Sequence, residues 1–358
     1  MTELIRRRLL GAGACLAGAG LLGISTIKRA SAATQIVITD PGGSSEVDFA
    51  KAYYEPFEKE TGIKVAYAAR PNLALGQLKA MVLAGRVDWN LTYLSDYLIE
   101  VAVAGNLLDK IDYSGFDKAL LGQMLPGTIT PYSAGGLMFA TVMAHSNKTF
   151  APGKGPKNWA DFWDVKNFPG RRSMMGFGNG PMEQALLADG VPKDQLYPID
   201  IPRALTKLDQ IRSHIDVWTS SSAQQVQLMV NQEVDIIQGF ANRLQSAIND
   251  GAPYTIVWQD GSYQGEQWVL PRGAGERPSA LKFIEFALRP EPQAKAAGGD
   301  GTGPTNSHAI DFVPPELRPR LPTYPDNVSK MYRVDAKWLA ENNDTLSARW
   351  TEWKAKAG

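Results

Sequence analysis

The sequence contains almost no cysteine, and this excludes several kinds of site. Cys15 is the one cysteine among 358 residues, and it lies in a leader that we expect to be removed. Without it the chain can form no disulfide, thiolate nucleophile or cysteine metal site. The three histidines, His145, His214 and His308, are scattered and form no pair with metal-ligand spacing. We therefore expect no metal and no other cofactor.

An excess of charge of one sign is also absent. The chain has 37 basic and 37 acidic residues, so its formal net charge is zero. Residues 1–32 carry five of the basic residues and one of the acidic ones, which leaves 32 basic and 36 acidic residues in the rest of the chain. A mildly acidic protein of this kind gives no indication of nucleic-acid binding.

No hydrophobic run is long enough to span a bilayer. An apolar, glycine-rich stretch of about sixteen residues runs from Leu9 to Ile24, below the usual spanning length. Basic residues 6–8 precede it and the small residues 30–32 follow it, a pattern typical of an export signal. The basic residues with the two leucines after them also resemble a twin-arginine signal. A membrane anchor and a lipoprotein processed at Cys15 fit less well, so we predict cleavage after Ala32 and a periplasmic protein.

Common catalytic motifs are missing as well. The sequence has no Gly-x-Ser-x-Gly elbow and no Walker-type phosphate loop, and no carboxylate pair is marked by its spacing. A Ser–His–Asp triad assembled from distant residues stays open, but nothing in the sequence favours it. An exported hydrolase is therefore the less favoured alternative, and we predict no catalytic residue and no enzyme.

The pattern that is present indicates an α/β fold. Residues 35–39 and 63–67 have the composition of strands, and residues 46–60 between them alternate apolar and charged residues at helical period. Such a unit predicts a parallel sheet with a right-handed crossover. Gly43 and Ser44 follow the first strand, where a glycine lets a ligand approach and a hydroxyl at a helix start can hold an anion. A plain turn explains these two residues equally well.

The stretch around residues 234–271 is the most informative. Residues 234–240 form an apolar strand that ends at Phe240, and helical spacing resumes at Leu244. Arg243 therefore lies at the carboxyl edge of a sheet, where open α/β folds place ligands. A second strand, a polar turn over residues 259–262 and Glu266 follow. A cation and an anion at strand edges fit a small ligand with both charges, although a structural Arg–Glu ion pair is an alternative.

Several strings resemble those of the periplasmic solute-binding proteins of ABC transporters, in the polyamine-binding branch of spermidine and putrescine binders. They are residues 159–164 (WADFWD), 168–172 (FPGRR), 190–198 (GVPKDQLYP), 233–235 (EVD), 268–274 (WVLPRGA) and 303–306 (GPTN). The resemblance covers essentially the whole chain after the leader.

This resemblance implies a type II periplasmic binding protein fold, with two α/β lobes joined by a hinge and the ligand in the cleft between them. We expect residues 33–139 in lobe 1, 140–266 in lobe 2, 267–310 back in lobe 1, and a C-terminal helical segment 311–358 packing on lobe 2. The resemblance also implies a monomer that delivers its ligand to an inner-membrane ABC permease. We expect the hinge segments near Ala140 and Trp268.

In the polyamine binders, aromatic side chains enclose the methylenes and carboxylates hold the ammonium groups. Ser95 and Tyr97 match a Ser-x-Tyr contact of the first lobe, although Ser95 is as readily a helix cap. Phe240 matches an aromatic wall and Glu266 an amine-holding carboxylate. Glu183 falls near a second such acid, although a carboxylate at a helix start is also stabilised by the helix dipole.

Two departures from the branch change the expected ligand. Thr302 replaces a tyrosine common in its Gly-Tyr-x-Pro-Thr motif, and Arg243 stands in or beside a position where several polyamine binders carry an acid. A guanidinium disfavours a dication but binds a carboxylate in a bidentate manner. We therefore predict a zwitterionic ω-amino acid such as γ-aminobutyrate, with a polyamine as the alternative. Trp258 and Tyr263 would add apolar walls.

Overall fold

The computed structural model describes residues 34–40, 44–69, 74–298 and 301–356. The predicted export signal and Gly43 lie outside these ranges. Residues 33–358 form one compact unit. None of the helices in the described ranges is long and apolar enough to cross a membrane.

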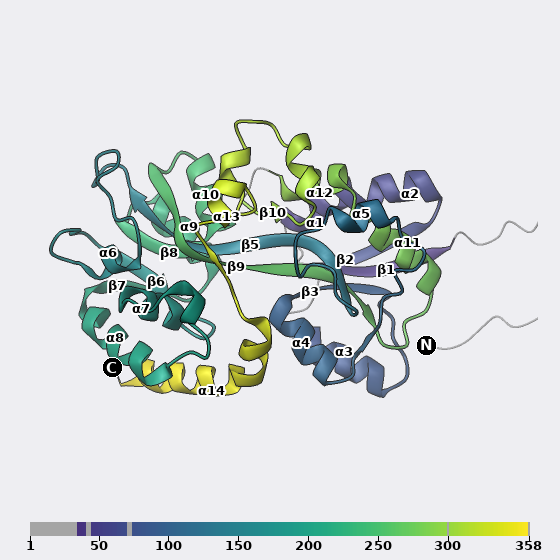
Figure 1. Cartoon of the computed structure of the whole chain (residues 1–358), viewed down its shortest axis with the longest axis horizontal. Coiled ribbons are helices and arrows are strands. Elements are labelled where there is room, and N and C mark those ends of the chain that lie inside the picture. The colour runs from purple at the N-terminus through teal and green to yellow at the C-terminus, as the bar shows by residue number, and fades with distance from the viewer. Residues whose placement is uncertain (1–33, 41–43, 70–73, 299–300, 357–358) are drawn as a thin grey trace, which may run out of the picture. The chain divides into compact units, whose positions relative to one another are not determined.

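A mixed sheet runs through the molecule, with strand order β2-β1-β3-β9-β5-β8-β6-β7. β1 pairs in parallel with β2 and β3, and β6 pairs in parallel with β7 and β8. The long strands β5 and β9 run antiparallel between these two groups (Figure 1). The bounds are β1 Gln35–Asp40, β2 Lys64–Ala69, β3 Leu91–Ser95, β5 Ser133–Ser146, β6 Arg172–Met175, β7 Ile215–Thr219, β8 Ile236–Phe240 and β9 Tyr254–Pro271. The short strands β4 Leu108–Asp109, β10 Gly303–Pro304 and β11 Tyr332–Arg333 pair with β9, β5 and β9.

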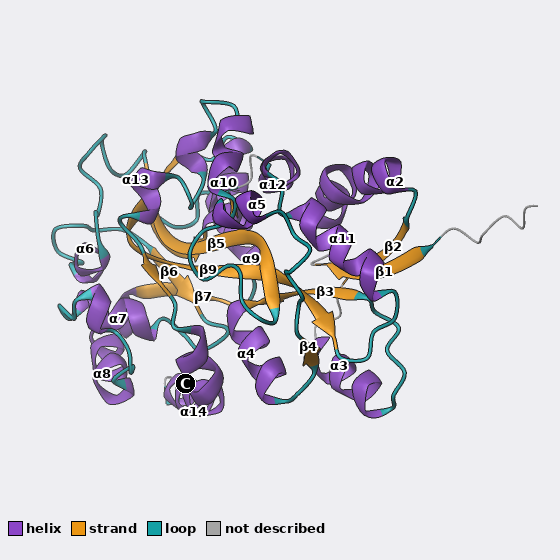
Figure 2. Ribbon diagram, turned by 45° about the vertical axis from the view of Figure 1, so that its right-hand side comes forward, coloured by secondary structure: helices purple, strands orange, loops and turns teal. Residues whose placement is uncertain are grey.

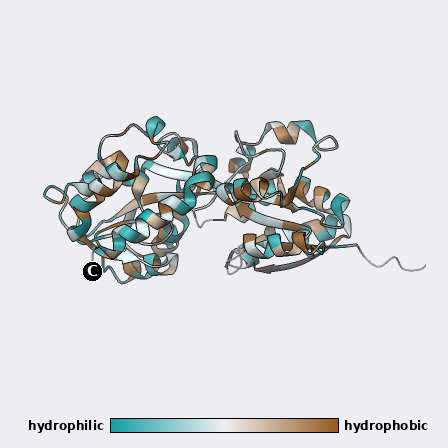
Figure 3. Ribbon diagram, turned by 90° about the horizontal axis from the view of Figure 1, so that it is seen from below, coloured by the Kyte–Doolittle hydropathy of each residue, from teal (hydrophilic) through white to brown (hydrophobic). Residues whose placement is uncertain are grey.

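Helices pack on both faces of this sheet (Figure 2), as expected of an α/β fold. Their hydrophobic and hydrophilic residues lie on different sides (Figure 3), and in α8 the inner side consists of Ala204, Leu205, Leu208 and Ile211. The bounds are α1 Ser44–Phe49, α2 Glu55–Thr61, α3 Ala74–Leu83, α4 Asp96–Ala104, α5 Lys118–Gly122, α6 Trp159–Trp163, α7 Met182–Ala188, α8 Ile201–Ile211, α9 Ser222–Val230, α10 Ala241–Asn249, α11 Arg277–Ala287, α12 Pro290–Ala297, α13 Pro325–Val328 and α14 Ala336–Ala355.

The predicted strand–helix–strand unit at the start is confirmed. β1 leads through α1, a π-helical turn over Ala50–Tyr54 and α2 to β2, which pairs with β1 in parallel. Phe49, Tyr53 and Phe57 point inward and are at most 2% exposed. They pack with Trp268 and Phe283 into an aromatic core under the first strands. The helical period of the sequence therefore places the right face of this segment inward.

The polar turn predicted over residues 259–262 is wrong, because these residues belong to a bulge within β9. Thr141 pairs with Ser262 whereas Met143 pairs with Val257, so several residues of β9 stand opposite one residue of β5. Asp260 has a positive φ of 57°. Its carbonyl accepts the Trp159 indole N–H at 2.8 Å and its N–H donates to the Lys330 carbonyl at 3.1 Å. These contacts satisfy the bulged backbone, so the strand continues.

The C-terminal helix is longer than expected. The sequence predicts a helix over about residues 335–342 with a tryptophan-bearing tail, whereas α14 continues to Ala355. The Asp335 carboxylate caps its start by accepting the Trp338 N–H at 2.9 Å. Trp350 and Trp353 are buried and stack at 5.0 Å between ring centroids. α14 contacts both α8 and α4. The predicted lobe boundaries stay a prediction.

Candidate functional site

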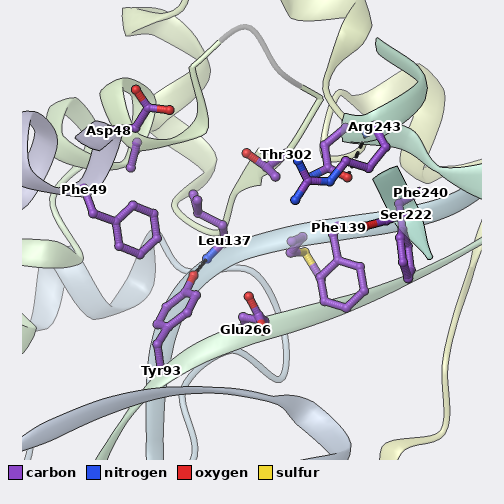
Figure 4. A pocket seen from close by; sticks show the side chains of 13 residues that line it. Asp48, Phe49, Tyr93, Leu137, Phe139, Ser222, Phe240, Arg243, Glu266 and Thr302 are labelled. Carbon is purple, nitrogen blue, oxygen red and sulfur yellow. Dashed lines mark hydrogen bonds between the residues drawn. The ribbon is translucent and has the colours of Figure 1, made fainter. Parts of the chain in front are cut away.

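A hollow of about 250 Å³ lies where β8 passes into α10, above β5 and β9 (Figure 4). Its lining comes from segments far apart in the sequence. The side chains are Asp48 and Phe49 of α1, Tyr93 of β3, Leu137, Met138 and Phe139 of β5, Ser222 of α9, Phe240, Asn242 and Arg243 around the β8–α10 junction, Glu266 of β9, Ala296 of α12, and Thr302. Four of the predicted ligand-binding residues, Arg243, Glu266, Phe240 and Thr302, therefore lie together.

Arg243 is placed by the strand-to-helix junction that the sequence predicts. β8 ends at Phe240, α10 begins at Ala241, and Arg243 lies in the first helical turn. The Asn242 side-chain oxygen accepts the Arg243 backbone N–H at 3.0 Å. Figure 4 shows the guanidinium directed into the hollow. It forms no ion pair with an acid of the described residues, so the alternative of a structural Arg243–Glu266 pair is wrong.

Glu266 reaches the hollow from the centre of the sheet. It lies opposite Ser95 of β3 and Leu137 of β5, and its half-buried carboxylate points toward the space beside Leu137 (Figure 4). The Leu137 N–H donates to the Tyr93 hydroxyl at 2.5 Å, and Tyr93 is 1% exposed. The floor beneath Glu266 is thus a packed aromatic ring held by a hydrogen bond.

Apolar rings line the same hollow as the guanidinium and the carboxylate. Phe139 of β5 and Phe240 meet edge to face at 5.9 Å between centroids, and Phe240 also contacts Phe177 at 6.1 Å. Such a surface can bury the methylenes of a short ligand. The site therefore provides a cation, an anion and an apolar wall in one hollow.

Tyr97 and Glu183 line a second hollow of about 310 Å³, which shares Phe240 with the first. The Glu183 carboxylate accepts a hydrogen bond from the Tyr197 hydroxyl. Burial raises the pKa of Glu183, and the hydrogen bonds from Tyr197 and Tyr332 oppose this only in part. The Glu183 carboxylate is thus already engaged by two tyrosine hydroxyls.

The remaining predicted residues lie elsewhere. Ser95 is buried at the N-cap position of α4, but its side chain makes no cap hydrogen bond. Trp258 lines a separate hollow of about 580 Å³ with Lys157 and Lys330. Tyr263 is half-buried against the hydrophobic cluster around β5 and β8. The side chain of Ser44 lies outside the described residues.

Sequence reasoning missed nine of the thirteen lining residues, and four of these nine show why. Phe139 sits in a uniformly apolar run, and Tyr93 in a strand whose facing direction depends on its partners. Asp48 is an exposed acid of α1 that Figure 4 places across the hollow from Arg243. Ser222 follows the Ser221 cap of α9, so a serine at this place is explained by capping alone. Among the described residues, no group of three or more metal-ligating side chains occurs.

The sequence is similar to those of known solute-binding proteins. A family model described as bacterial extracellular solute-binding protein matches residues 52–323. A γ-aminobutyric acid-binding protein of Pseudomonas aeruginosa is 30% identical over 94% of this chain and 96% of its own length. A spermidine/putrescine-binding periplasmic protein of Escherichia coli is 24% identical over 76% of this chain and 79% of its own length.

Solved structures show the same fold. An ABC transporter substrate-binding protein from Bradyrhizobium japonicum is 31% identical, with a TM-score of 0.82 over 89% of this chain and 99% of that chain. The Atu4243 GABA receptor is 31% identical, with a TM-score of 0.81 over 90% of this chain and 98% of that chain. The expected type II binding-protein fold is thus confirmed.

Proposed function

This chain belongs to the bacterial extracellular solute-binding protein family, and from that premise we propose that its cargo is a small zwitterionic ω-amino acid such as γ-aminobutyrate. The observation that carries the proposal is the shared hollow. Arg243 offers a guanidinium with no acidic partner among the described residues, Glu266 offers a carboxylate, and Phe139 and Phe240 line the same hollow.

In the proposed complex, Arg243 binds the ligand carboxylate through two parallel hydrogen bonds, a geometry for which the planar guanidinium is suited. Glu266 accepts the ammonium group, and the rings cover the methylenes. Two further observations support this cargo: one relative binds γ-aminobutyric acid according to its name, and one solved neighbour is a GABA receptor.

A polyamine is the second candidate, because the spermidine/putrescine-binding proteins are also relatives. Glu266 suits an ammonium group of either ligand. Arg243 separates them, since a guanidinium beside a second ammonium costs several kcal/mol through like-charge repulsion. Glu183 is engaged by the Tyr197 hydroxyl and lines the second hollow rather than the first, which weakens the case for a second ammonium site at this residue.

Transport follows from ligand-linked closure in this proposal. Arg243 lies within the predicted lobe 2 and Thr302 within the predicted return segment of lobe 1, so a ligand in the hollow contacts both. It stabilises a closed form by binding it more tightly than the open form, with rotation near Ala140 and Trp268. An ABC permease of the inner membrane then takes the cargo from a monomeric, non-enzymatic protein that is exported to the periplasm and processed after Ala32.

Calorimetric titration of the exported protein with four ligands tests the cargo. γ-Aminobutyrate carries both charges, butyrate lacks the amine, butylamine lacks the carboxylate, and putrescine carries two amines. We expect γ-aminobutyrate to bind most tightly. Arg243→Gln should weaken it by roughly 30-fold or more, since one partner of a desolvated charge pair is lost, and should spare or improve putrescine.

Glu266→Gln should give the complementary result, weakening γ-aminobutyrate and leaving butyrate nearly unchanged. Asp109→Asn is the matched control, because Asp109 is an acid paired with β9 that does not line the hollow, and it should leave the affinity for γ-aminobutyrate unchanged. Tighter binding of putrescine than of γ-aminobutyrate by the unaltered protein would reject the zwitterion. Retention of γ-aminobutyrate binding by Arg243→Gln would reject the role of the guanidinium.

A further inference from the structure

A buried carboxylate lies beneath the site without lining it. Asp96 is the first residue of α4 and is 5% exposed. Its Oδ1 accepts the Gln267 side-chain N–H at 2.6 Å, and its Oδ2 accepts the Gly265 backbone N–H at 3.0 Å. The Arg333 guanidinium donates to the same Oδ2 at 3.1 Å. Both carboxylate oxygens are therefore occupied.

Two of these partners flank Glu266 on β9. β3 ends at Ser95, which stands opposite Glu266, so the next residue along β9, Gly265, has no β3 residue opposite it. The Asp96 carboxylate takes the N–H that the sheet ladder leaves there. A Cβ on Gly265 would lie 2.9 Å from the Asp96 Oδ1, so this close approach requires a glycine.

Arg333 ties the carboxylate to the C-terminal segment. It lies on β11 beside Tyr263 of β9. Its other hydrogen bonds go to the carbonyls of Pro126 and Gly127, at 3.0 and 3.1 Å. β11 precedes α14, which packs against α4. A buried carboxylate is expensive unless several donors compensate it, and here an ion pair and two hydrogen bonds do so.

We propose that Asp96, paired with Arg333, is a positioning residue that holds the Gly265 backbone and the Gln267 side chain on either side of Glu266 and thereby sets the affinity for the ammonium end of the ligand. The proposal rests on the proposed function for the role of Glu266. The carboxylate touches no part of the hollow, so its effect reaches the ligand only through the direction of the Glu266 side chain.

The test compares γ-aminobutyrate with butyrate in titrations of Asp96→Asn, Arg333→Gln and Arg333→Lys. Asparagine presents an N–H₂ group where one carboxylate oxygen accepts hydrogen bonds, so one of the flanking contacts is lost. We expect the Kd for γ-aminobutyrate to rise by about tenfold or more, while the Kd for butyrate changes by less than about twofold. Arg333→Gln should raise the Kd for γ-aminobutyrate by a smaller factor, and Arg333→Lys should retain most of the affinity.

Asp109→Asn provides a matched control. Asp109 also accepts a backbone N–H just after β9, from Gly273 at 3.1 Å, and pairs with Arg277 at 3.4 Å, but it does not line the hollow. It should leave both affinities unchanged. A loss of equal size for both ligands, or no loss, in folded Asp96→Asn and Arg333→Gln would overturn the proposal.

Amide hydrogen exchange at Gly265 and Glu266 distinguishes a failure of the positioning role of Asp96 from a failure of the proposed cargo. Faster exchange at these amides in Asp96→Asn, with unchanged exchange in β1 and β2, supports the positioning role, and unchanged exchange at Gly265 refutes it. Failure of the unaltered protein to bind either ligand would refute the proposed cargo, and exchange would still decide whether Asp96 fixes this part of β9.

Discussion

Replacement of Arg172 by methionine should destabilise the protein far more than the same change at its neighbour Arg171. Arg172 is 2% exposed and stands at the start of β6. Its guanidinium donates to the carbonyls of Phe162 at 3.0 Å and Gly170 at 2.7 Å, and also to that of Phe168. One side chain thus satisfies one carbonyl of α6 and two of the segment that links α6 to β6.

The size of the effect follows from those partners. Methionine fills much of the volume but leaves the carbonyls without a donor in a buried region. Each unsatisfied buried group costs about 1–3 kcal/mol, and loss of a buried network member costs about 3–5 kcal/mol in total. Arg171 is 53% exposed, with a 3.6 Å contact to Asp235. Loss of such an exposed pair costs about 0–1 kcal/mol.

Urea denaturation of Arg171→Met and Arg172→Met, followed by tryptophan fluorescence, measures both changes. We expect the midpoint of Arg172→Met to fall strongly with little change in slope. Arg172→Lys should recover only part of the loss, because an ammonium group cannot reach three carbonyls with the geometry of a guanidinium. A difference between the two methionine variants below about 1 kcal/mol would refute the reasoning.

Two further predictions concern groups around the site. Burial raises the pKa of Glu183 above its ordinary value of 4.5. As the pH rises from about 4.5, the unfolded chain therefore loses this proton before the folded protein does. The free energy of unfolding should fall over this pH range. Glu183→Gln should remove that decline, which thermal unfolding at a series of pH values will reveal; an unchanged decline would contradict it. Gly136→Ala should cost about 1–3 kcal/mol, because a Cβ there would lie 2.2 Å from the Tyr93 hydroxyl and 2.6 Å from the Glu266 carbonyl. Gly115→Ala, with no atom within 4 Å of the added Cβ, is its control in the same melting experiment, and equal melting temperatures would count against the prediction.

Local patterns in the sequence were sufficient to predict much of the fold. The helical period of residues 46–60 placed Phe49, Tyr53 and Phe57 inward, because that face depends only on spacing along one helix. Arg243 could be placed at a strand end for a similar reason, since a strand and the helix after it are read from adjacent residues. Its position in the hollow follows from the rule that ligands bind at the carboxyl edge of a sheet.

The rest of the site depends on pairing between distant strands. Phe139 and Glu266 lie together through the register of β5 and β9, which no local pattern encodes. The bulge in β9 shifts that register, and Trp258, which lies in it, lines a different hollow from Phe240. Asp96 and Arg333 meet across 237 residues of sequence, and a charged pair at such a separation gives no signal in a single chain.

Phe240 borders both hollows, and this makes one ring the divider between two compartments. In the proposed complex the cargo would occupy only the first hollow, so the bulk of this ring would limit the chain length of the cargo. A smaller side chain at this position would join the compartments and admit longer molecules while leaving both charged contacts intact. In such a pocket, different residues select the length and the charge of the ligand. Natural or designed relatives can therefore change the preferred length without changing the preferred charge.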